Sequence, residues 1–383
     1  MQVLKMNNII RASKQYLKRS EAIMKKVLIS PSKYVQGEGE LSNLGAYVND
    51  FASKALLVAS TVDQARVQNY LDEAIKKCPF EIFYTDFREE CTKKEIERVR
   101  LLAEEKGCEV FIGLGGGKAL DTAKAASHLS KKPVIIIPTI ASTDAPTSKL
   151  AIVYTEESAF EEYMHLHKNP DLVLVDTGII SKAPTRFLVS GMGDALSTYF
   201  EARSCVRSNA NNMPGGKSTK AAFAIATLCY ETLLAESIKA KAACDLNVVT
   251  PALENIVEAN ILLSGLGFES SGLAAAHAVH NGLTVLEETH KYYHGEKVSF
   301  GTLVHLVLEN SPNEEFGTVL NYCKSVGLPT CLKDLGIVNV TKDKIMAVAK
   351  AACAEGETIH NMPFEVTPES VYAAILVADK LGQ

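Results

Sequence analysis

The stretch Val110-Phe-Ile-Gly-Leu-Gly-Gly-Gly-Lys-Ala-Leu-Asp121 decides the fold, because an apolar run in it passes directly into a glycine cluster and then into a helical pattern. Further apolar runs lie at 55–60, 81–85, 134–138 and 172–176. Their hydrophobicity is continuous rather than alternating, which indicates strands covered on both faces, and amphipathic helical stretches separate several of them. The first half of the chain is therefore predicted to be a parallel sheet flanked by helices.

The pattern changes after about residue 181, where helical segments follow one another without strand-like runs. They are expected at roughly 192–206, 217–244, 250–265, 270–286, 295–309, 313–325, 342–355 and 368–381. We therefore predict an α/β domain at 27–180 and an all-α domain at 181–383. The first 26 residues carry seven basic side chains and one acidic one, so this N-terminal extension is either an organelle-targeting segment or a loosely structured leader to the first domain.

Composition and charge limit the class of protein. Hydrophobic residues make up 47% of the 383 residues, and the formal charge of −5 argues against nucleic acid or an anionic membrane as the main partner. The sequence has no uninterrupted apolar run of about twenty residues, so we predict no transmembrane helix. The nine cysteines form no Cys-x-x-Cys pair, which favours reduced thiols and a cytoplasmic location. A small molecule is the expected ligand.

The glycine cluster Gly115, Gly116 and Gly117 is followed by Lys118 and opens a predicted helix. Glycines at such a turn let the backbone approach a ligand closely, and the free N–H groups favour a pyrophosphate. The cluster is not a Walker A loop, because no Ser or Thr follows Lys118, and it is not a strict Gly-x-Gly-x-x-Gly motif. Taken alone, it fits nucleotide binding and a glycine-rich turn without a ligand equally well.

A second polar loop follows the next predicted strand and runs Pro138-Thr-Ile-Ala-Ser-Thr-Asp-Ala-Pro-Thr-Ser148. Its hydroxyls and its carboxylate should emerge at the carboxyl edge of the sheet, where open α/β folds bind ligands. Ordinary turn chemistry would also explain this polar content.

A third group of chemically useful residues lies in the helical half. Asp194 is expected in the first turn of a helix, where a carboxylate is most often a cap or a partner of the helix dipole. His277 and His280 fall at positions i and i+3 of an alanine-rich helix, and His294 precedes the next helix. Such histidines, with a carboxylate elsewhere, suggest a divalent metal site, although satisfied core or surface histidines explain them equally well.

At this point the residues amount to a resemblance. The chain is similar to the bacterial glycerol dehydrogenases, the zinc-dependent polyol branch of the iron-containing alcohol dehydrogenase superfamily, in the strings Gly-Gly-Gly-Lys-Ala-Leu-Asp-Thr-Ala-Lys, Pro-Thr-Ile-Ala-Ser-Thr-Asp-Ala-Pro-Thr-Ser, Gly-Met-Gly-Asp-Ala-Leu-Ser-Thr, His-Ala-Val-His-Asn-Gly and Tyr-His-Gly-Glu-Lys-Val. The similarity runs from about Val27 to Gln383. It implies an α/β N-terminal domain with a parallel Rossmann-like sheet and an all-α C-terminal domain, the dehydroquinate synthase-like fold of that superfamily.

The resemblance also implies an enzyme that oxidises glycerol and related vicinal diols with NAD in a cleft between the domains, giving dihydroxyacetone from glycerol. It implies zinc on Asp194, His277 and His294, which also hold the substrate, and a substrate contact at Asp144. The implied cofactor contacts are Gly115, Gly116, Gly117, Lys118, Asp121, Thr139, Thr143, Ser148, Leu150 and Tyr154. His280 is a candidate for relaying the proton, for contacting the ribose or for supporting ligand His277. A homo-oligomer, often an octamer, is implied as well.

Two positions depart from the family's pattern. Thr198 stands where the wider superfamily has a further histidine, which leaves three protein ligands and favours zinc over iron. Ser60 stands where the family has an aspartate beside the adenosine ribose, so strict preference for NAD is in doubt. Asp63 is either a substitute for that aspartate or a cap of the following helix.

Two other functions stay as alternatives. One is a lyase of the same fold, similar to dehydroquinate synthase, which also holds NAD and a metal. A site for its phosphate-bearing acid substrate would need several Lys or Arg residues, and the loops quoted above offer few. The other is a metalloprotein without activity that serves as a binding module.

Overall fold

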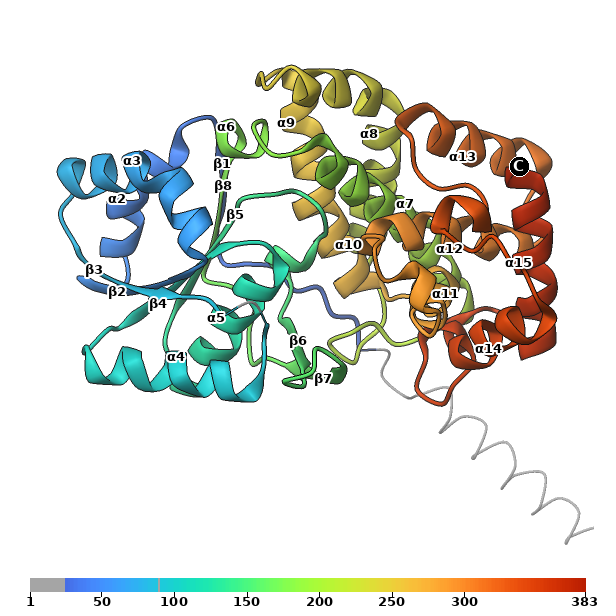
Figure 1. Ribbon diagram of the computed structural model, residues 1–383, viewed down its shortest axis with the longest axis horizontal. Helices are drawn as coiled ribbons and strands as arrows, with labels where there is room; N and C mark the ends of the chain where they lie inside the picture. The colour runs from blue at the N-terminus through green and yellow to red at the C-terminus, as the bar shows by residue number, and fades with distance from the viewer. Residues whose placement is uncertain (1–24, 89) are drawn as a thin grey trace, which may run out of the picture.

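The computed structural model describes residues 25–88 and 90–383, and its two parts lie side by side in Figure 1. The strands lie in the first part, at the left of the view, and the long helices fill the second. The predicted combination of an α/β first half and a helical second half is confirmed. The predicted extension at 1–26 lies outside the described residues except for its last two, and the boundary at 180/181 stays a prediction.

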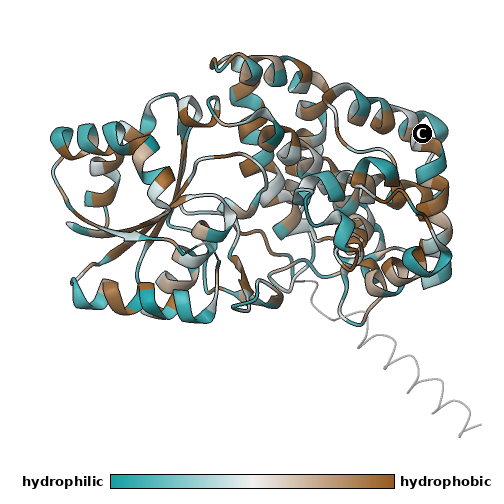
Figure 2. Cartoon of the chain, viewed as in Figure 1, coloured by the Kyte–Doolittle hydropathy of each residue, from teal (hydrophilic) through white to brown (hydrophobic). Residues whose placement is uncertain are grey.

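A six-stranded sheet with only parallel pairs forms the centre of the first part, in the order β1-β8-β5-β4-β2-β3. Its strands are β1 (Tyr34–Gly37), β2 (Lys54–Ala59), β3 (Glu81–Asp86), β4 (Val110–Gly115), β5 (Val134–Pro138) and β8 (Leu172–Asp176). Strands β4, β5 and β8 are buried along their whole length, as their continuous apolar runs predict. Figure 2 shows the strands mostly brown, between helices that carry both colours.

The connecting helices lie on both faces of this sheet. They are α2 (Leu44–Asn49), α3 (Thr61–Lys77), α4 (Lys93–Glu105), α5 (Gly117–Ser130) and α6 (Thr177–Ile180), with short η1 (Glu40–Asn43) and η2 (Ala145–Thr147). Alternate residues of β2 belong to different apolar clusters: Leu56 faces one and Leu57 the other. The first of these clusters continues into the helical half, where Phe300 belongs to it, so one core joins the two parts.

Three strands were not expected from the sequence. Besides β1, they are β6 (Leu150–Tyr154) and β7 (Phe160–His165), which form an antiparallel hairpin beside the sheet. β1 is only four residues long and half-buried, and most of β7 is exposed and carries two glutamates. Neither segment therefore has the continuous apolar run that marks the central strands.

The second part consists of helices α7 to α15. Their bounds are α7 (Thr185–Ser208), α8 (Lys220–Asp245), α9 (Pro251–Glu258), η3 (Ala259–Leu263), α10 (Ser264–Ser271), α11 (Ala275–Leu283), η4 (Glu287–Thr289), α12 (His294–Leu308), α13 (Asn313–Val326), η5 (Leu332–Leu335), α14 (Lys342–Ala352), η6 (Thr358–Asn361) and α15 (Pro368–Gly382). The expected start of the helix at 270–286 was wrong, because helix α10 ends at Ser271, just before Gly272, where φ is 109°, and α11 begins only at Ala275. The expected start of a helix near residue 192 was also wrong, since α7 begins at Thr185 after Pro184.

Helix α8 is the one helix within residues 25–88 and 90–383 that is long and apolar enough to cross a membrane, judged by length and composition alone. Charged residues interrupt this helix, so it is not an uninterrupted apolar run of the kind that the sequence was expected to lack. Helix α8 packs against α7 and α9, and glutamates Glu231 and Glu236 interrupt its apolar sequence. A helix in the core of a soluble protein passes the same test, so the absence of a membrane partner stays a prediction.

Candidate active site

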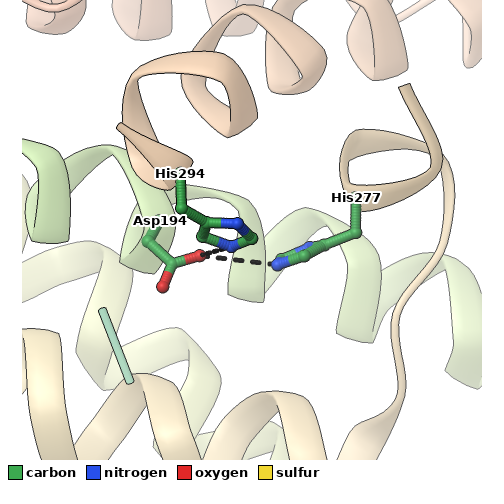
Figure 3. A group of neighbouring side chains, drawn as sticks. All are labelled: Asp194, His277 and His294. Carbon is green, nitrogen blue, oxygen red and sulfur yellow. Dashed lines mark hydrogen bonds and ion pairs between the residues drawn. The ribbon is translucent and has the colours of Figure 1, made fainter. Parts of the chain in front are cut away.

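Three side chains that could together hold a metal ion come from three different helices and converge in the helical half (Figure 3). Asp194 comes from the interior of α7, His277 from α11, and His294 is the first residue of α12. The Nε2 atoms of His277 and His294 lie 3.4 and 3.1 Å from Oδ1 of Asp194. Asp194 is buried within α7, nine residues after its first residue Thr185, so the cap and helix-dipole explanations for this carboxylate are wrong.

Glycines let the helices that carry these ligands approach one another. A Cβ atom on Gly193 would overlap the carbonyl oxygen of Gly295, and a Cβ on Gly295 would overlap the carbonyl oxygen of Ser190. Helices α7 and α12 are therefore in backbone contact beside Asp194 and His294. Gly191 has a different neighbour, because a Cβ there would overlap the carbonyl oxygen of Ala141 in the loop after β5.

Glu201 orients His277 and was not predicted from the sequence. Its Oε2 atom lies 2.6 Å from Nδ1 of His277, and its Oε1 atom accepts the backbone N–H groups of Ala274 and His277 at 2.8 and 3.0 Å. When the ring is neutral, as it must be to bind a metal, donation from Nδ1 to this carboxylate leaves the lone pair of His277 on Nε2, the atom that faces Asp194. Glu201 lies seven residues after Asp194 on the same helix face, and this spacing could have identified it.

His280 performs the matching role for His294. Nδ1 of His294 lies 3.1 Å from Nε2 of His280, and Nδ1 of His280 lies 3.0 Å from Oδ1 of Asn281, whose amide donates to Glu357. All of these hydrogen bonds can form when each Nδ1 is the donor, and the neutral ring of His294 then has its lone pair on Nε2. Burial, then the charges of His294 and Lys297, lower the pKa of His280 well below its usual value, so it is neutral. Of the roles considered for His280, this geometry supports holding a ligand in place, though of His294 and not of His277.

The charges at this point suit a bound cation. Burial raises the pKa of Asp194, but the charge of His294 and the hydrogen bonds from both histidines outweigh it and hold that pKa well below its usual range. Burial lowers the pKa of His277, but Glu201 and Asp194 outweigh it and raise that pKa well above its usual value. One carboxylate oxygen and two oriented imidazole nitrogens lie within 4.8 Å of one another and could hold a divalent metal ion.

The polar loop after β5 reaches this group. The backbone N–H of Asp144 donates to Oδ2 of Asp194 at 3.3 Å, and Ser264 donates its hydroxyl to the Asp144 carboxylate at 2.6 Å. Burial, followed by the charge of Asp194, raises the pKa of Asp144 well above its usual value. Thr198 does not join the ligands, because its hydroxyl lies 2.9 Å from that of Ser264.

The same loop begins at the glycine turn. The backbone N–H of Thr139 donates to the carbonyl of Gly115 at 3.1 Å, and its hydroxyl donates to Asp63 at 3.2 Å. Gly115 has φ of 138°, a conformation that favours glycine, and a Cβ on Gly117 would meet nothing within 4 Å. The turn therefore leaves open space for a ligand, and a single loop of about ten residues connects it to the metal-ligating group.

The other residues predicted to contact the cofactor differ in burial and in the side chains that they contact. Nζ of Lys118 lies 2.7 Å from Glu90, which was not predicted, and 5.3 Å from the centre of the Tyr154 ring. Asp121 is 5% exposed, and its carboxylate is paired with Lys124 and with the backbone N–H of Ile152. In this structure Asp121 joins α5 to β6, and its predicted contact with the cofactor stays a prediction. Gly116, Thr143 and Leu150 are partly exposed, whereas Ser148 is buried.

Comparison with known proteins identifies the family of this chain. The iron-containing alcohol dehydrogenase family matches residues 31–177. A glycerol dehydrogenase of Citrobacter freundii is 56% identical over 364 residues, which cover 94% of this chain and 99% of that protein. The solved structure of a probable glycerol dehydrogenase from Sinorhizobium meliloti has a TM-score of 0.87 at 46% identity and covers 94% of this chain and 99% of its own. That of glycerol dehydrogenase from Schizosaccharomyces pombe has a TM-score of 0.90 at 39% identity, with 94% and 91% covered.

These relatives confirm the resemblance inferred from the motifs, and nothing in them favours the lyase. Identity of this extent along nearly the whole length is far above the level at which only a fold is shared. The chain belongs to the glycerol dehydrogenase family of the iron-containing alcohol dehydrogenases.

Proposed function

We propose that this protein is an oxidoreductase that transfers a hydride from glycerol to NAD, giving dihydroxyacetone, NADH and a proton, and that it accepts related vicinal diols. The observation that carries the proposal is the loop from Thr139 to Ser148, which touches the glycine turn at one end and the ligand Asp194 near its middle. The glycerol dehydrogenases that match nearly the whole chain support the substrate. A cleft between the two parts is the proposed place of reaction.

The metal is proposed to be zinc, although the family is named for iron. Asp194, His277 and His294 would hold it, and Thr198 supplies no further donor because its hydroxyl bonds to Ser264. Three protein donors of this kind favour zinc. When bound, zinc supplies a Lewis acid that makes a diol hydroxyl acidic, and NAD supplies the hydride acceptor.

The protein's own residues bind and orient. Glu201 and His280 fix the two imidazoles so that both Nε2 atoms point at one position. Asp144 lies next to Asp194 and is the proposed contact for a substrate hydroxyl. Lys118 and the glycine turn are proposed to hold the pyrophosphate and ribose side of NAD. The proposed contacts around the nicotinamide are Thr139, Thr143, Ser148, Leu150 and Tyr154.

The protein is further proposed to be a cytoplasmic homo-oligomer, an octamer by resemblance. Support comes from α8, where Leu228, Leu234 and Ile238 expose 50, 39 and 63% of their surface. An exposed apolar helix face of this kind is typical of a contact with another protein surface. Light scattering on the purified protein measures the subunit number, and a monomer would contradict the proposal.

The experiment that tests the function combines turnover with metal analysis. We expect the purified protein to reduce NAD with glycerol, to contain close to one zinc per chain, and to lose activity in a chelator and regain it with zinc. An Asp144→Asn variant should raise KM for glycerol more than it weakens NADH binding. Activity that persists in metal-free protein, or that only ferrous iron restores, would contradict the metal assignment. No NAD reduction with any diol would favour the inactive binding module.

A further inference from the structure

A cavity of about 420 Å³ lies at the carboxyl edge of the sheet, outside the residues predicted for the cofactor. It is lined by Ser60, Thr61, Val62, Asp86, Phe87 and Arg88. Residues 60–62 follow β2, Asp86 ends β3, and residues 87–88 follow it; β2 and β3 are the last two strands at one side of the sheet.

The cavity lies next to the glycine turn. The register pairs Val58 of β2 with Gly113 of β4, so Ser60 is level with Gly115. Asp63, in the first turn of α3, lies against Gly115, where an added Cβ would be 3.2 Å from its Oδ2 atom. When a dinucleotide binds with its pyrophosphate at such a turn, its adenosine ribose falls at the end of the neighbouring strand. The cavity lies at the end of β2, the neighbouring strand, and so at the expected position of the adenosine ribose.

Asp86 is the one acid among the six lining residues, and Asp63 lies beside the cavity against the glycine turn; the hydrogen bonds that both carboxylates accept direct them toward the protein. The carboxylate of Asp63 accepts hydrogen bonds from Ser60 at 2.8 Å and from Thr139 at 3.2 Å, so it faces the glycine turn. The carboxylate of Asp86 accepts the N–H and the hydroxyl of Thr61 at 3.0 and 2.9 Å. At the end of β2 itself stands Ser60, which has no charge.

Arg88 supplies a positive charge to the cavity. Its side chain is exposed, and among the described residues no carboxylate lies within ion-pair distance of its guanidinium. Its backbone N–H donates to Glu95 at 3.2 Å, which fixes the position from which the side chain extends. A carboxylate at the ribose binds the 2′-hydroxyl and repels a 2′-phosphate, whereas a nearby arginine accommodates that phosphate.

We propose that this cavity accepts the 2′-phosphate of NADP, held by Arg88 and tolerated because Ser60 carries no charge, so that the enzyme binds both nicotinamide dinucleotides. This inference rests on the proposed binding of a dinucleotide at the glycine turn. It assigns to Arg88 and Ser60 the choice between the two cofactors.

The test measures binding rather than turnover. Titrations followed by the fluorescence of the nicotinamide give Kd for NADH and NADPH, and calorimetry compares adenosine 2′,5′-bisphosphate with 5′-AMP. We expect the wild type to bind NADPH within about tenfold of NADH, and Arg88→Ala to weaken NADPH about tenfold more than NADH, the effect of losing a charge-assisted bond to phosphate. Arg100→Ala, a surface arginine paired with Glu97, is the control and should alter neither Kd.

A second pair of variants isolates the charge at the end of β2. Ser60→Asp and Ser60→Asn both keep a side chain that can cap α3, but only the aspartate adds a negative charge. We expect Ser60→Asp to weaken NADPH about tenfold relative to Ser60→Asn while NADH follows the opposite trend or stays the same. Equal effects of these two variants on NADPH would overturn the role of Ser60.

The outcomes separate this inference from the proposed function. A wild type that binds NADH but not NADPH, or an Arg88→Ala variant that weakens both cofactors equally, overturns the inference and leaves the dinucleotide site in place. Failure to bind either cofactor overturns the proposed function itself. NADPH binding that Arg88→Ala selectively weakens supports both.

Discussion

Replacing Glu201 by glutamine tests whether a buried carboxylate sets the tautomer of a metal-ligating histidine. In the native site Oε1 accepts two backbone N–H groups and Oε2 accepts Nδ1 of His277 at 2.6 Å. Glutamine keeps the size of the side chain but has only one oxygen. It can therefore accept hydrogen bonds either from the two backbone N–H groups or from Nδ1 of His277, but not from both. If the oxygen stays with the backbone, the amide NH₂ faces Nδ1, which must become an acceptor. The ring proton then moves to Nε2, the atom that would bind the metal.

The magnitude follows from these two arrangements. Loss of the partner that orients a ligand histidine costs about 10- to 100-fold in metal affinity, which is about 1.4 to 2.7 kcal/mol. In the reversed arrangement the NH₂ group faces the backbone N–H groups of Ala274 and His277, and unsatisfied buried donors cost about 1 to 3 kcal/mol of folding free energy each. Either way we expect weaker zinc binding, and in the second case a lower melting temperature as well.

The assay is competition for zinc between the metal-free protein and a chromogenic chelator, with thermal unfolding recorded with and without zinc. Glu254→Gln is the matched control, because Glu254 also accepts side-chain hydrogen bonds, from Gln36 and Thr177, but touches none of the three ligands. Zinc affinity in Glu201→Gln equal to that of the control, with unchanged unfolding of the metal-free protein, would refute the reasoning.

Three other variants probe the ligand, the helix contact and a distant charge network. His294→Ala should remove bound metal and glycerol oxidation together while circular dichroism stays native; an active metal-free variant would contradict the ligand assignment. Gly193→Ala forces α7 away from α12, so we expect the free energy of unfolding, measured with urea, to fall by about 1 to 3 kcal/mol and metal binding to weaken. Gly317→Ala is the control, because an added Cβ meets nothing within 4 Å there, and it should change neither quantity. Burial raises the pKa of Glu309, but His305, 3.7 Å away, and the hydrogen bonds from Ser204 and Arg203 outweigh it and bring the pKa to about 2 from 4.5. With solvent screening, the ionised form stabilises the fold by about 1 to 3 kcal/mol above about pH 4.5, and this contribution is lost as pH falls toward 2. Glu309→Gln should lack this part of the acid dependence; wild-type and variant stabilities that fall in parallel from pH 5 to 2 would contradict it.

The parts of this fold that the sequence predicts are those with a strong local pattern. The strands from β2 to β5 and β8 are continuous apolar runs, and their ends differ from the expectation by no more than two residues. The convergence of Asp194, His277 and His294 could be predicted because they are chemically unusual within small-residue helices and match family motifs; their role as metal ligands stays a prediction. The short β1 and the exposed β7 carry no such pattern, since a half-buried strand need not be apolar.

What the sequence could not provide is how side chains from distant segments pair. Glu201 and Asp121 are both acidic residues on helices beside glycine-containing motifs, yet one orients a ligand and the other is neutralised by Lys124 inside the core. His280 was assigned to its neighbour His277 by helical spacing, but its ring contacts His294, which follows a turn of the chain. Such choices depend on tertiary packing, which local spacing does not encode.

The loop from Thr139 to Ser148 belongs to the α/β half by sequence but also contacts the helical half. Asn260 donates to the carbonyl of Ala141 and Ser190 to that of Ser142. A chimera that joins the sheet of one homologue to the helices of another at residue 180 would therefore separate this loop from the partners that evolved with it. A chimera that takes the loop and the helices from the same homologue keeps these hydrogen bonds and so preserves the relative position of the two halves of the site.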